Sequence, residues 1–163
     1  MSSFNRRVFL LSSAAALAGC GFAPAYGPSG AATRLQNTIL VDAPTGRPSY
    51  LLTRYIEERL GRGSPGRYGL SYSIALTQEA IAISANNVTT RYNILGTVTY
   101  ALRDLQSGAV LLSGKADSFT GYSASGSTVA TQAAERDAEA RLMTILADQI
   151  VTRLMAASAS LPE

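Results

Sequence analysis

The sequence predicts an α+β fold in which two helices pack on one face of a four-stranded mixed or antiparallel sheet. Three observations carry this prediction. Apolar side chains alternate strictly from Tyr68 onward, which is typical of a strand with one buried face. A second long alternating run turns back near Gly108, as a β-hairpin does. Two other segments repeat apolar residues with the helical period. The expected order is strand, helix, strand, strand, strand, helix.

A short strand and a helix come first. The apolar run from Leu35 to Val41 predicts a strand, and its three consecutive apolar residues at the end favour a strand covered on both faces. A helix is expected to begin near Pro48 or Ser49, since both are accepted at a helix entry. Gly61 then ends it. The buried stripe of this helix is predicted to be Leu52, Ile56 and Leu60.

The other three strands are predicted from their alternation. The first runs toward a turn at Asn86-Asn87, and strands over residues 88–103 and 109–122 follow. The loop between these two ends in Gly108, where a positive φ is easiest. The second face of this hairpin is rich in Thr, Ser and Asn, so we expect a small, polar surface there. The apolar face of the first strand consists of Tyr68, Leu70, Tyr72, Ile74 and Leu76.

The last element is predicted to be a long helix from Ser127 or Thr128 to Met155, because either residue can cap a helix. Residues 35–156 are therefore expected to form a single domain, and residues 157–163 a frayed C-terminus. No repeat or second domain is apparent in the sequence. The main apolar stripe of the helix is Ala138, Leu142, Leu146, Ile150 and Leu154.

Residues 1–19 have the layout of a secretory signal. Arg6 and Arg7 form a basic segment, and the apolar run after them is too short and too broken to span a bilayer of about 30 Å. A cysteine stands where cleavage would fall. The run Leu17-Ala18-Gly19-Cys20 resembles the bacterial lipoprotein signal.

The chemistry of that signal explains the cysteine. Its thiol accepts a diacylglycerol, the peptide is cut before it, and the new amine can be acylated, for example with palmitate. Two or more acyl chains hold a protein durably on a membrane. We therefore expect a mature chain that begins at Cys20, with residues 20–34 as lipid anchor and flexible tether. The alternative is that Cys20 is a small buried residue. The general secretory route and the twin-arginine route both remain open, since Arg6-Arg7 suits either.

The composition argues against several classes of function. The chain has no histidine and one cysteine, which removes most transition-metal sites and the usual general base. Loss of Arg6 and Arg7 with the signal lowers the net charge from +3 to +1, so nothing indicates nucleic-acid binding. No cofactor motif is present. A carboxylate-based hydrolase stays open, but Glu135, Asp137 and Glu139 fall on a helical face. We expect a protein that is not an enzyme.

Several runs of residues together resemble the LptE family of lipopolysaccharide-assembly lipoproteins, in its alphaproteobacterial form. They cover essentially the whole mature chain, although no single one is diagnostic. The runs are Cys20-Gly21-Phe22, Tyr26-Gly27, Thr90-Arg91-Tyr92-Asn93, Leu102-Arg103-Asp104, residues 135–142 and residues 147–150. The resemblance implies a small α+β domain that plugs the outer-membrane β-barrel LptD, helps it assemble, and helps lipopolysaccharide reach the outer leaflet. It also implies a lipid-anchored location on the periplasmic side of the outer membrane, which the residue after the cysteine, Gly21, favours.

The resemblance implies binding of lipopolysaccharide, whose phosphates would pair with basic side chains. The candidates are Arg91, Arg103 and Lys115, all on the predicted hairpin. The alternative is that these are ordinary solvated charges on a strand. A second functional hypothesis is a structural or assembly subunit of another envelope complex, which would share the anchor and the fold and differ in its partner.

Overall fold

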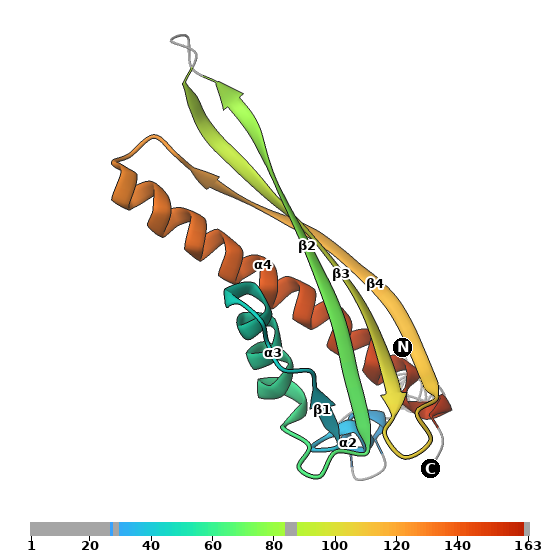
Figure 1. Cartoon of the computed structure of the whole chain (residues 1–163). Coiled ribbons are helices and arrows are strands. Elements are labelled where there is room, and N and C mark those ends of the chain that lie inside the picture. Colours follow the sequence, from blue (N-terminus) through green and yellow to red (C-terminus); the bar gives the residue numbers. More distant parts are fainter. Residues whose placement is uncertain (1–26, 28–29, 84–87, 162–163) are drawn as a thin grey trace, which may run out of the picture.

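The computed structural model describes residues 27, 30–83 and 88–161. It confirms an α+β fold with one four-stranded mixed sheet, in the order β1-β2-β3-β4. β1 is parallel to β2, and the other two pairs are antiparallel (Figure 1). The elements are α2 (Ala31–Leu35), β1 (Ile39–Val41), α3 (Arg47–Leu60), β2 (Tyr68–Ile83), β3 (Thr89–Asp104), β4 (Val110–Ser123), α4 (Thr128–Ala157) and the 3-10 turn η1 (Ser158–Ser160).

The core lies between one face of the sheet and the helices α3 and α4 (Figure 1). The predicted faces of β2 and β3 are confirmed at the base of the sheet, where Leu70 and Leu102 are cross-strand partners and both are fully buried. The whole predicted stripe of α4 is buried as well: Ala138, Leu142, Leu146, Ile150 and Leu154 have no exposed surface. Burial of these apolar side chains is the main force that holds the helix on the sheet.

The two main helices begin and end with local capping features. The backbone N–H of Gly46 donates to Ser49 Oγ over 2.9 Å, and Pro48 occupies the first turn of α3. Gly61 ends α3 at a φ of 72°, which glycine adopts without steric cost. At α4, the N–H of Ala130 donates to Ser127 Oγ over 3.3 Å, so Ser127 is the N-cap as predicted.

The first strand differs from the prediction. It begins at Ile39 instead of Leu35, and Leu35 ends the short helix α2, whose other residues, 31–34, lie within the segment expected to be tether. The expectation that the strand is covered on both faces is wrong, because Leu40 is 46% exposed while Ile39 is 1% exposed. The physical reason is that both large helices lie on the same side of the sheet, so no helix or strand that the structure describes covers the other face of β1 (Figure 1).

The expected fraying at the C-terminus is also wrong for residues 157–161. α4 continues to Ala157 and is followed by η1. Ser158 is 1% exposed, and its hydroxyl donates to the carbonyl of Met155 over 2.7 Å. η1 packs against α2, so the end of the chain closes the base of the domain.

The β2–β3 hairpin extends beyond the rest of the sheet. β4 ends at Ser123, which is paired with Arg91, while β2 and β3 continue past this point toward the tip (Figure 1). Exposure rises along β2, from 4% at Tyr68 to 62% at Ile83. The predicted turn at Asn86-Asn87 lies outside the described residues. The loop at the other end of β3 is confirmed, with Gly108 at a φ of 74°.

Helix α4 is long and apolar enough, by length and composition alone, to cross a membrane. In this fold it is the central core helix, since eight of its side chains are buried against the sheet and α3. Its apolar character is therefore accounted for by the core.

Candidate interaction surface

Within the part of the chain that the structure describes, no helix packs on the face of the sheet that points away from α3 and α4 (Figure 1). The predicted small and polar character is confirmed for most of it. The members that β2, β3 and β4 contribute along its central part are Ser71, Ser73, Ala75, Thr77, Leu95, Thr97, Thr99, Ala101, Ser113, Lys115, Asp117 and Phe119. Small side chains let another backbone approach closely, so this face is suited to contact with a second macromolecule.

One apolar pair interrupts the polar face. Leu95 and Phe119 are cross-strand partners, and they are 36% and 63% exposed. Aromatic–aliphatic pairs of this kind stabilise a sheet and offer an anchor to a binding partner. Sequence reasoning missed the pair, although the alternation of both strands places each residue on the outer face.

The three predicted basic residues all lie on this face but in different surroundings. Arg103 donates from Nη2 to Ser71 Oγ over 2.9 Å. Lys115 is neutralised by Asp117, with 3.1 Å between Nζ and Oδ1. The side chain of Arg91 is exposed and makes no hydrogen bond or ion pair with any other described residue. Of the three, Arg91 has the charge that is most available to an anion.

The structure does not bring these residues together into one site. Lys115 lies opposite Thr99, which is four residues from Arg103 and eight from Arg91 along β3. At about 3.3 Å per residue, these separations are roughly 13 Å and 26 Å. One phosphate group cannot reach all three, so any anion contact at Arg91 is separate from the other two.

The carboxylate of Asp117 is held ionised by its neighbours. The Thr97 hydroxyl donates to Oδ1 over 2.7 Å, and together with the Lys115 ammonium it lowers the pKa of Asp117 below its ordinary value. The pair of Lys115 and Asp117 therefore presents no net charge, and this part of the face is polar without being basic.

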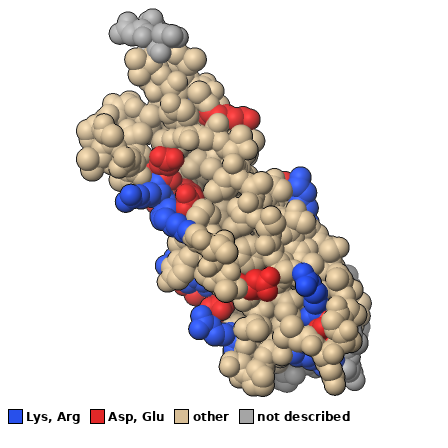
Figure 2. All heavy atoms as spheres, in the orientation of Figure 1, with Lys and Arg blue, Asp and Glu red and all other residues tan. Residues whose placement is uncertain are grey.

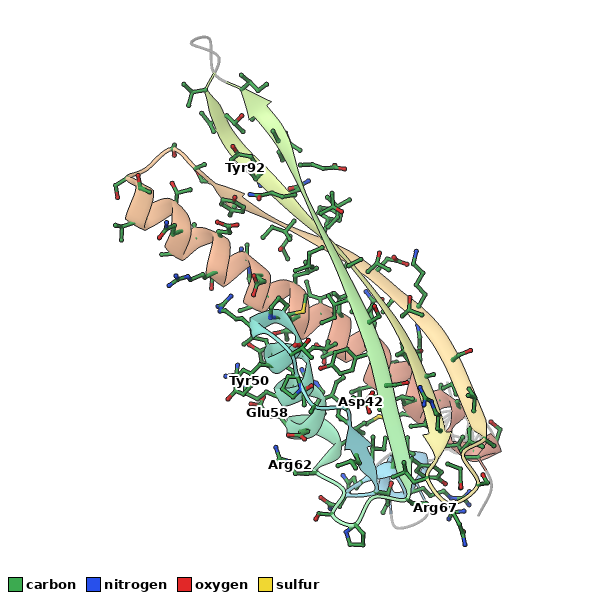
Figure 3. All side chains as sticks on the ribbon, in the orientation of Figure 1. Asp42, Tyr50, Glu58, Arg62, Arg67 and Tyr92 are labelled. Atoms are coloured by element: carbon green, nitrogen blue, oxygen red, sulfur yellow. The ribbon has the colours of Figure 1, made fainter. Side chains whose placement is uncertain are left out.

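Arg91 lies beside a shallow pocket at the distal end of the sheet. The pocket has a volume of about 530 Å³ and is lined by the ends of β2, β3 and β4. Next to it, on the helix side of the sheet, the rings of Tyr92 and Tyr122 stack with centroids 5.4 Å apart. Gln78 Nε2 donates to the Tyr122 hydroxyl, and burial raises the pKa of Tyr122. These contacts fix the distal end, where Tyr92 lies far from Arg67 at the base (Figure 3).

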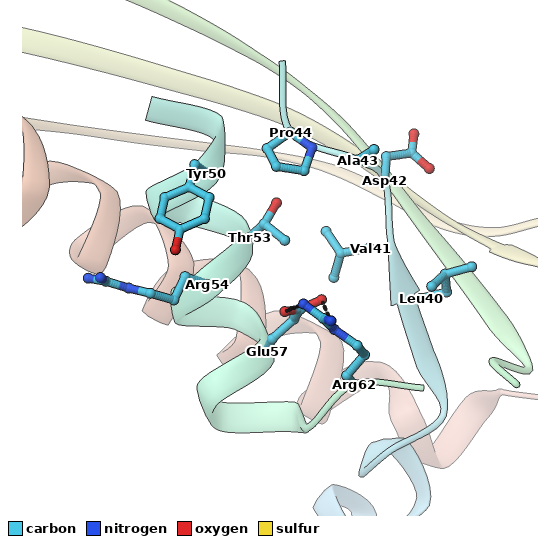
Figure 4. A pocket seen from close by; sticks show the side chains of 10 residues that line it. All are labelled: Leu40, Val41, Asp42, Ala43, Pro44, Tyr50, Thr53, Arg54, Glu57 and Arg62. Atoms are coloured by element: carbon cyan, nitrogen blue, oxygen red, sulfur yellow. Dashed lines mark hydrogen bonds and ion pairs between the residues drawn. The ribbon is translucent and has the colours of Figure 1, made fainter. Parts of the chain in front are cut away.

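A second pocket, of about 500 Å³, lies between the edge of β1 and α3 (Figure 4). Its main charged groups satisfy each other: Arg62 holds the Glu57 carboxylate through Nε at 3.0 Å and Nη2 at 2.7 Å. This contact raises the pKa of Arg62. The remaining lining is half apolar and half polar: Leu40, Val41, Ala43, Pro44, Asp42, Tyr50, Thr53 and Arg54. Neither a nucleophile–base pair nor a group of metal ligands is formed there by the residues that the structure describes.

The carboxylates that sequence reasoning considered for a hydrolase lie on α4. Glu139 pairs with Arg47 over 2.6 Å, and Asp137 pairs with Arg141 one helical turn away. Both pairs lie at the surface: the first joins α3 to α4, and the second joins neighbouring turns of α4. The predicted lipidation residue Cys20, with Leu17, Ala18 and Gly19, lies outside the described residues.

Fold and surface together define a small α+β protein whose free sheet face is its main candidate for contacts with other molecules. Comparison with known families gives a match to "LptE: Lipopolysaccharide-assembly" over residues 36–154. The chain belongs to this family, and membership indicates a role in lipopolysaccharide assembly. No curated protein matches the chain significantly.

Solved structures agree with the family assignment. A Caulobacter crescentus CB15 protein described as a lipoprotein is 28% identical, with a TM-score of 0.69, over 83% of this chain and 100% of its own. A minor lipoprotein from Acinetobacter baumannii has a TM-score of 0.53 at 18% identity, covering 72% of this chain and 88% of its own. Lipoprotein B from Nitrosomonas europaea has a TM-score of 0.55 at 15% identity, covering 77% and 90%. The last two show the fold alone.

Proposed function

We propose that this protein is an outer-membrane lipoprotein that plugs an LptD-like β-barrel, helps that barrel assemble, and so takes part in lipopolysaccharide transport to the outer leaflet. The observation that carries the proposal is the family match over residues 36–154, which spans nearly the whole described domain. The free sheet face supports it physically, because its small polar side chains suit the wet, polar interior of a large barrel.

The anchor has a simple mechanical part in this proposal. Acyl chains on Cys20 would hold the chain at the inner surface of the outer membrane. The ten residues from Cys20 to Ser29 could span at most about 35 Å when fully extended. The domain would therefore stay close to the barrel opening, at a high local concentration relative to its partner.

The proposed role needs no catalysis. In the pocket between β1 and α3, Glu57 is paired with Arg62, and on α4 Asp137, Glu139 and Asp148 form surface ion pairs. Direct contact with lipopolysaccharide is the finer part of the proposal. Arg91 is the strongest candidate for a phosphate contact, since Lys115 is neutralised by Asp117 and Arg103 is held by Ser71.

Site-specific photocrosslinking in the native envelope tests this function. A photoreactive amino acid at Thr99, at the centre of the free sheet face, should capture a large outer-membrane barrel. The same amino acid at Thr152, which is exposed on α4, is the matched control and should capture less of it. Capture of a different envelope protein from Thr99 would support the alternative of a subunit of another complex. Capture of no protein from either position would contradict both readings.

A further inference from the structure

The two edges of the sheet differ in whether other parts of the fold hydrogen-bond to their backbone. At the β4 edge, polar side chains of α4 bind the outward-pointing backbone carbonyls. Arg141 Nη2 donates to the carbonyl of Gly121 over 3.2 Å, and Gln149 Nε2 donates to that of Asp117 over 3.2 Å. Arg153 Nη1 donates to the carbonyl of Lys115. This edge is therefore capped.

The capping follows from matched spacings. The three donors lie on one row of α4 at intervals of four or eight residues, and the three carbonyls lie on alternate residues of β4. Four helical residues rise about 6.0 Å, and two strand residues rise about 6.6 Å, so the row and the edge stay in step. A capped edge cannot easily add another strand, which is how proteins avoid unwanted pairing.

The edge of β2 is open beyond the short strand β1. The N–H of Tyr68 donates to Thr38, and the carbonyl of Leu70 accepts from Asp42 over 3.0 Å, so the even-numbered residues of β2 face this edge. β1 ends there, and β2 continues without a neighbouring strand (Figure 1). The same backbone groups of Tyr72, Ile74, Leu76 and Gln78 make no hydrogen bond to another element among the described residues.

This open edge carries none of the usual protection. β2 has no charged residue and no proline from Tyr68 to Gln78, and its register is regular up to Ala80. Lysine, proline or a bulge would normally blunt an exposed edge of this length. Figure 2 shows few charged side chains in the upper part of the molecule. The Lys and Arg side chains (blue) and the Asp and Glu side chains (red) are more frequent lower down.

A groove runs along the open edge. It has a volume of about 430 Å³ and lies between the segment Thr45–Ser49 at the start of α3 and the segment Tyr72–Leu76 of β2. Because both segments line the groove, a chain that adds to this edge would run past the start of α3. On the helix side, Leu76 is 37% exposed and would contact an apolar side chain of that chain.

We propose that an extended segment of the barrel partner adds to the open edge of β2, at Tyr72–Gln78, as a further strand of the sheet. The proposal rests on the proposed function. Backbone donors and acceptors repeating every second residue are recognised by another extended polypeptide. In the partner's segment, apolar residues that point toward the helices would alternate with small polar residues that point toward the free sheet face.

Other occupants fit less well. Pro24 and Pro28 leave the N-terminal segment of this chain without two of the N–H groups that a strand needs. A second copy would bring its own Thr45–Ser49 segment to a groove that the same segment of the first copy already lines.

Three variants test the proposal by co-purification with the barrel from native envelopes. Leu76→Pro removes one outward N–H of the open edge and leaves the bonds to β3 in place. We expect about tenfold less barrel, because one interfacial hydrogen bond is lost and the incoming strand is displaced by the ring. Leu76→Ala keeps the N–H and should retain most of the barrel. Thr152→Ala, on the exposed side of α4 and away from the open edge, is the control for a surface substitution and should also retain it.

Thermal unfolding of each variant shows whether it folds, and a photoreactive residue at Thr77 in the unaltered strand gives a second readout. Crosslinked peptides should come from one extended segment of the barrel. Equal barrel recovery for Leu76→Pro and the wild type would overturn the edge proposal while the proposed function stands. Absence of barrel from the wild type would overturn both. Crosslinks to a second copy of this chain would overturn the assignment to a barrel segment and show that the open edge pairs in a dimer.

Discussion

At the scale of single residues, two glycines are required for different reasons. A Cβ at Gly63 would lie 2.8 Å from the backbone of Thr38 and Ile39, and its N–H donates to the carbonyl of Ile39 over 2.9 Å. Gly108 has open space around it, but its φ of 74° is unfavourable for other residues. The first glycine is needed for close packing and the second for the turn.

These two reasons predict different losses in the free energy of unfolding when each glycine is replaced by alanine. Gly63→Ala should lower the free energy of unfolding by roughly 1–3 kcal/mol, because strand backbone cannot move away as a flexible side chain can. Gly108→Ala should cost about 1 kcal/mol, from backbone strain alone. Urea unfolding of both variants at the same pH measures this. A larger loss of stability for Gly108→Ala than for Gly63→Ala would show that the backbone of Thr38 and Ile39 can move to admit a Cβ at residue 63.

Asp104 gives a prediction on pH. The backbone N–H and the hydroxyl of Ser107 donate to its carboxylate over 2.7 and 3.0 Å, and these bonds lower its pKa in the folded state. A lowered pKa stabilises the fold at pH values above the unfolded pKa of about 3.9, and this contribution is lost as the pH falls through the folded pKa.

Asp104→Ala should therefore lower the Tm at neutral pH and reduce the further drop in Tm on acidification below about pH 4. Glu58→Ala, in an exposed pair on α3, serves as the control for loss of one surface carboxylate. The measurement is a series of melting curves from neutral to acidic pH. An unchanged acid-induced drop in the Asp104→Ala variant would mean that this carboxylate is not linked to folding.

At the scale of elements, alternation and helical periodicity were sufficient to predict the three long strands and both large helices. They were insufficient for β1, because an apolar run does not reveal that Leu40 lies on an uncovered face. They also missed η1, since burial of Ser158 depends on contact with α2, which is distant in sequence. The row of α4 that caps β4 was invisible for the same reason: each side chain reads as an ordinary exposed residue.

That row has its own consequence for self-association. Removing Arg141, Gln149 and Arg153 together by substitution with Ala should expose the carbonyls of β4 and promote pairing of this edge between molecules. Sedimentation velocity at rising concentration should detect dimers or larger species. The double variant Arg54→Ala, Arg62→Ala, which loses the same charge from α3 and from the loop after it, should stay at the wild-type mass. Wild-type behaviour in both variants would show that the row does not protect the edge.

At the scale of the whole molecule, the charges hold the helices to each other. Arg47 and Glu139 join α3 to α4 over 2.6 Å, and Arg59 and Asp148 do so over 2.5 Å. The three basic residues predicted as a lipopolysaccharide site share a face, as the alternation implied, but they are spread along it. Sequence spacing along one strand predicts the face of a residue, whereas the contacts of its side chain, on the same strand for Lys115 and on another for Arg103, decide how available its charge is.

The anchor and the domain should be separable in the whole molecule. Cys20→Ala should leave the domain folded, since Cys20 lies outside the residue range that forms the core, and should release it from the membrane. Fractionation of the envelope, with thermal unfolding of the purified variant, measures both properties. Retention of the unacylated protein in the outer membrane would mean that its partner holds it without the anchor.

The central claim is that the protein is the plug of a barrel, and the mass of its complex tests it most directly. The tagged, lipidated protein would be purified from its own envelope in mild detergent. The mass of the complex would then be measured and its members identified. We predict one copy of this protein with one large outer-membrane β-barrel. Recovery of the protein alone, or with a different envelope complex in stable ratio, would contradict the claim.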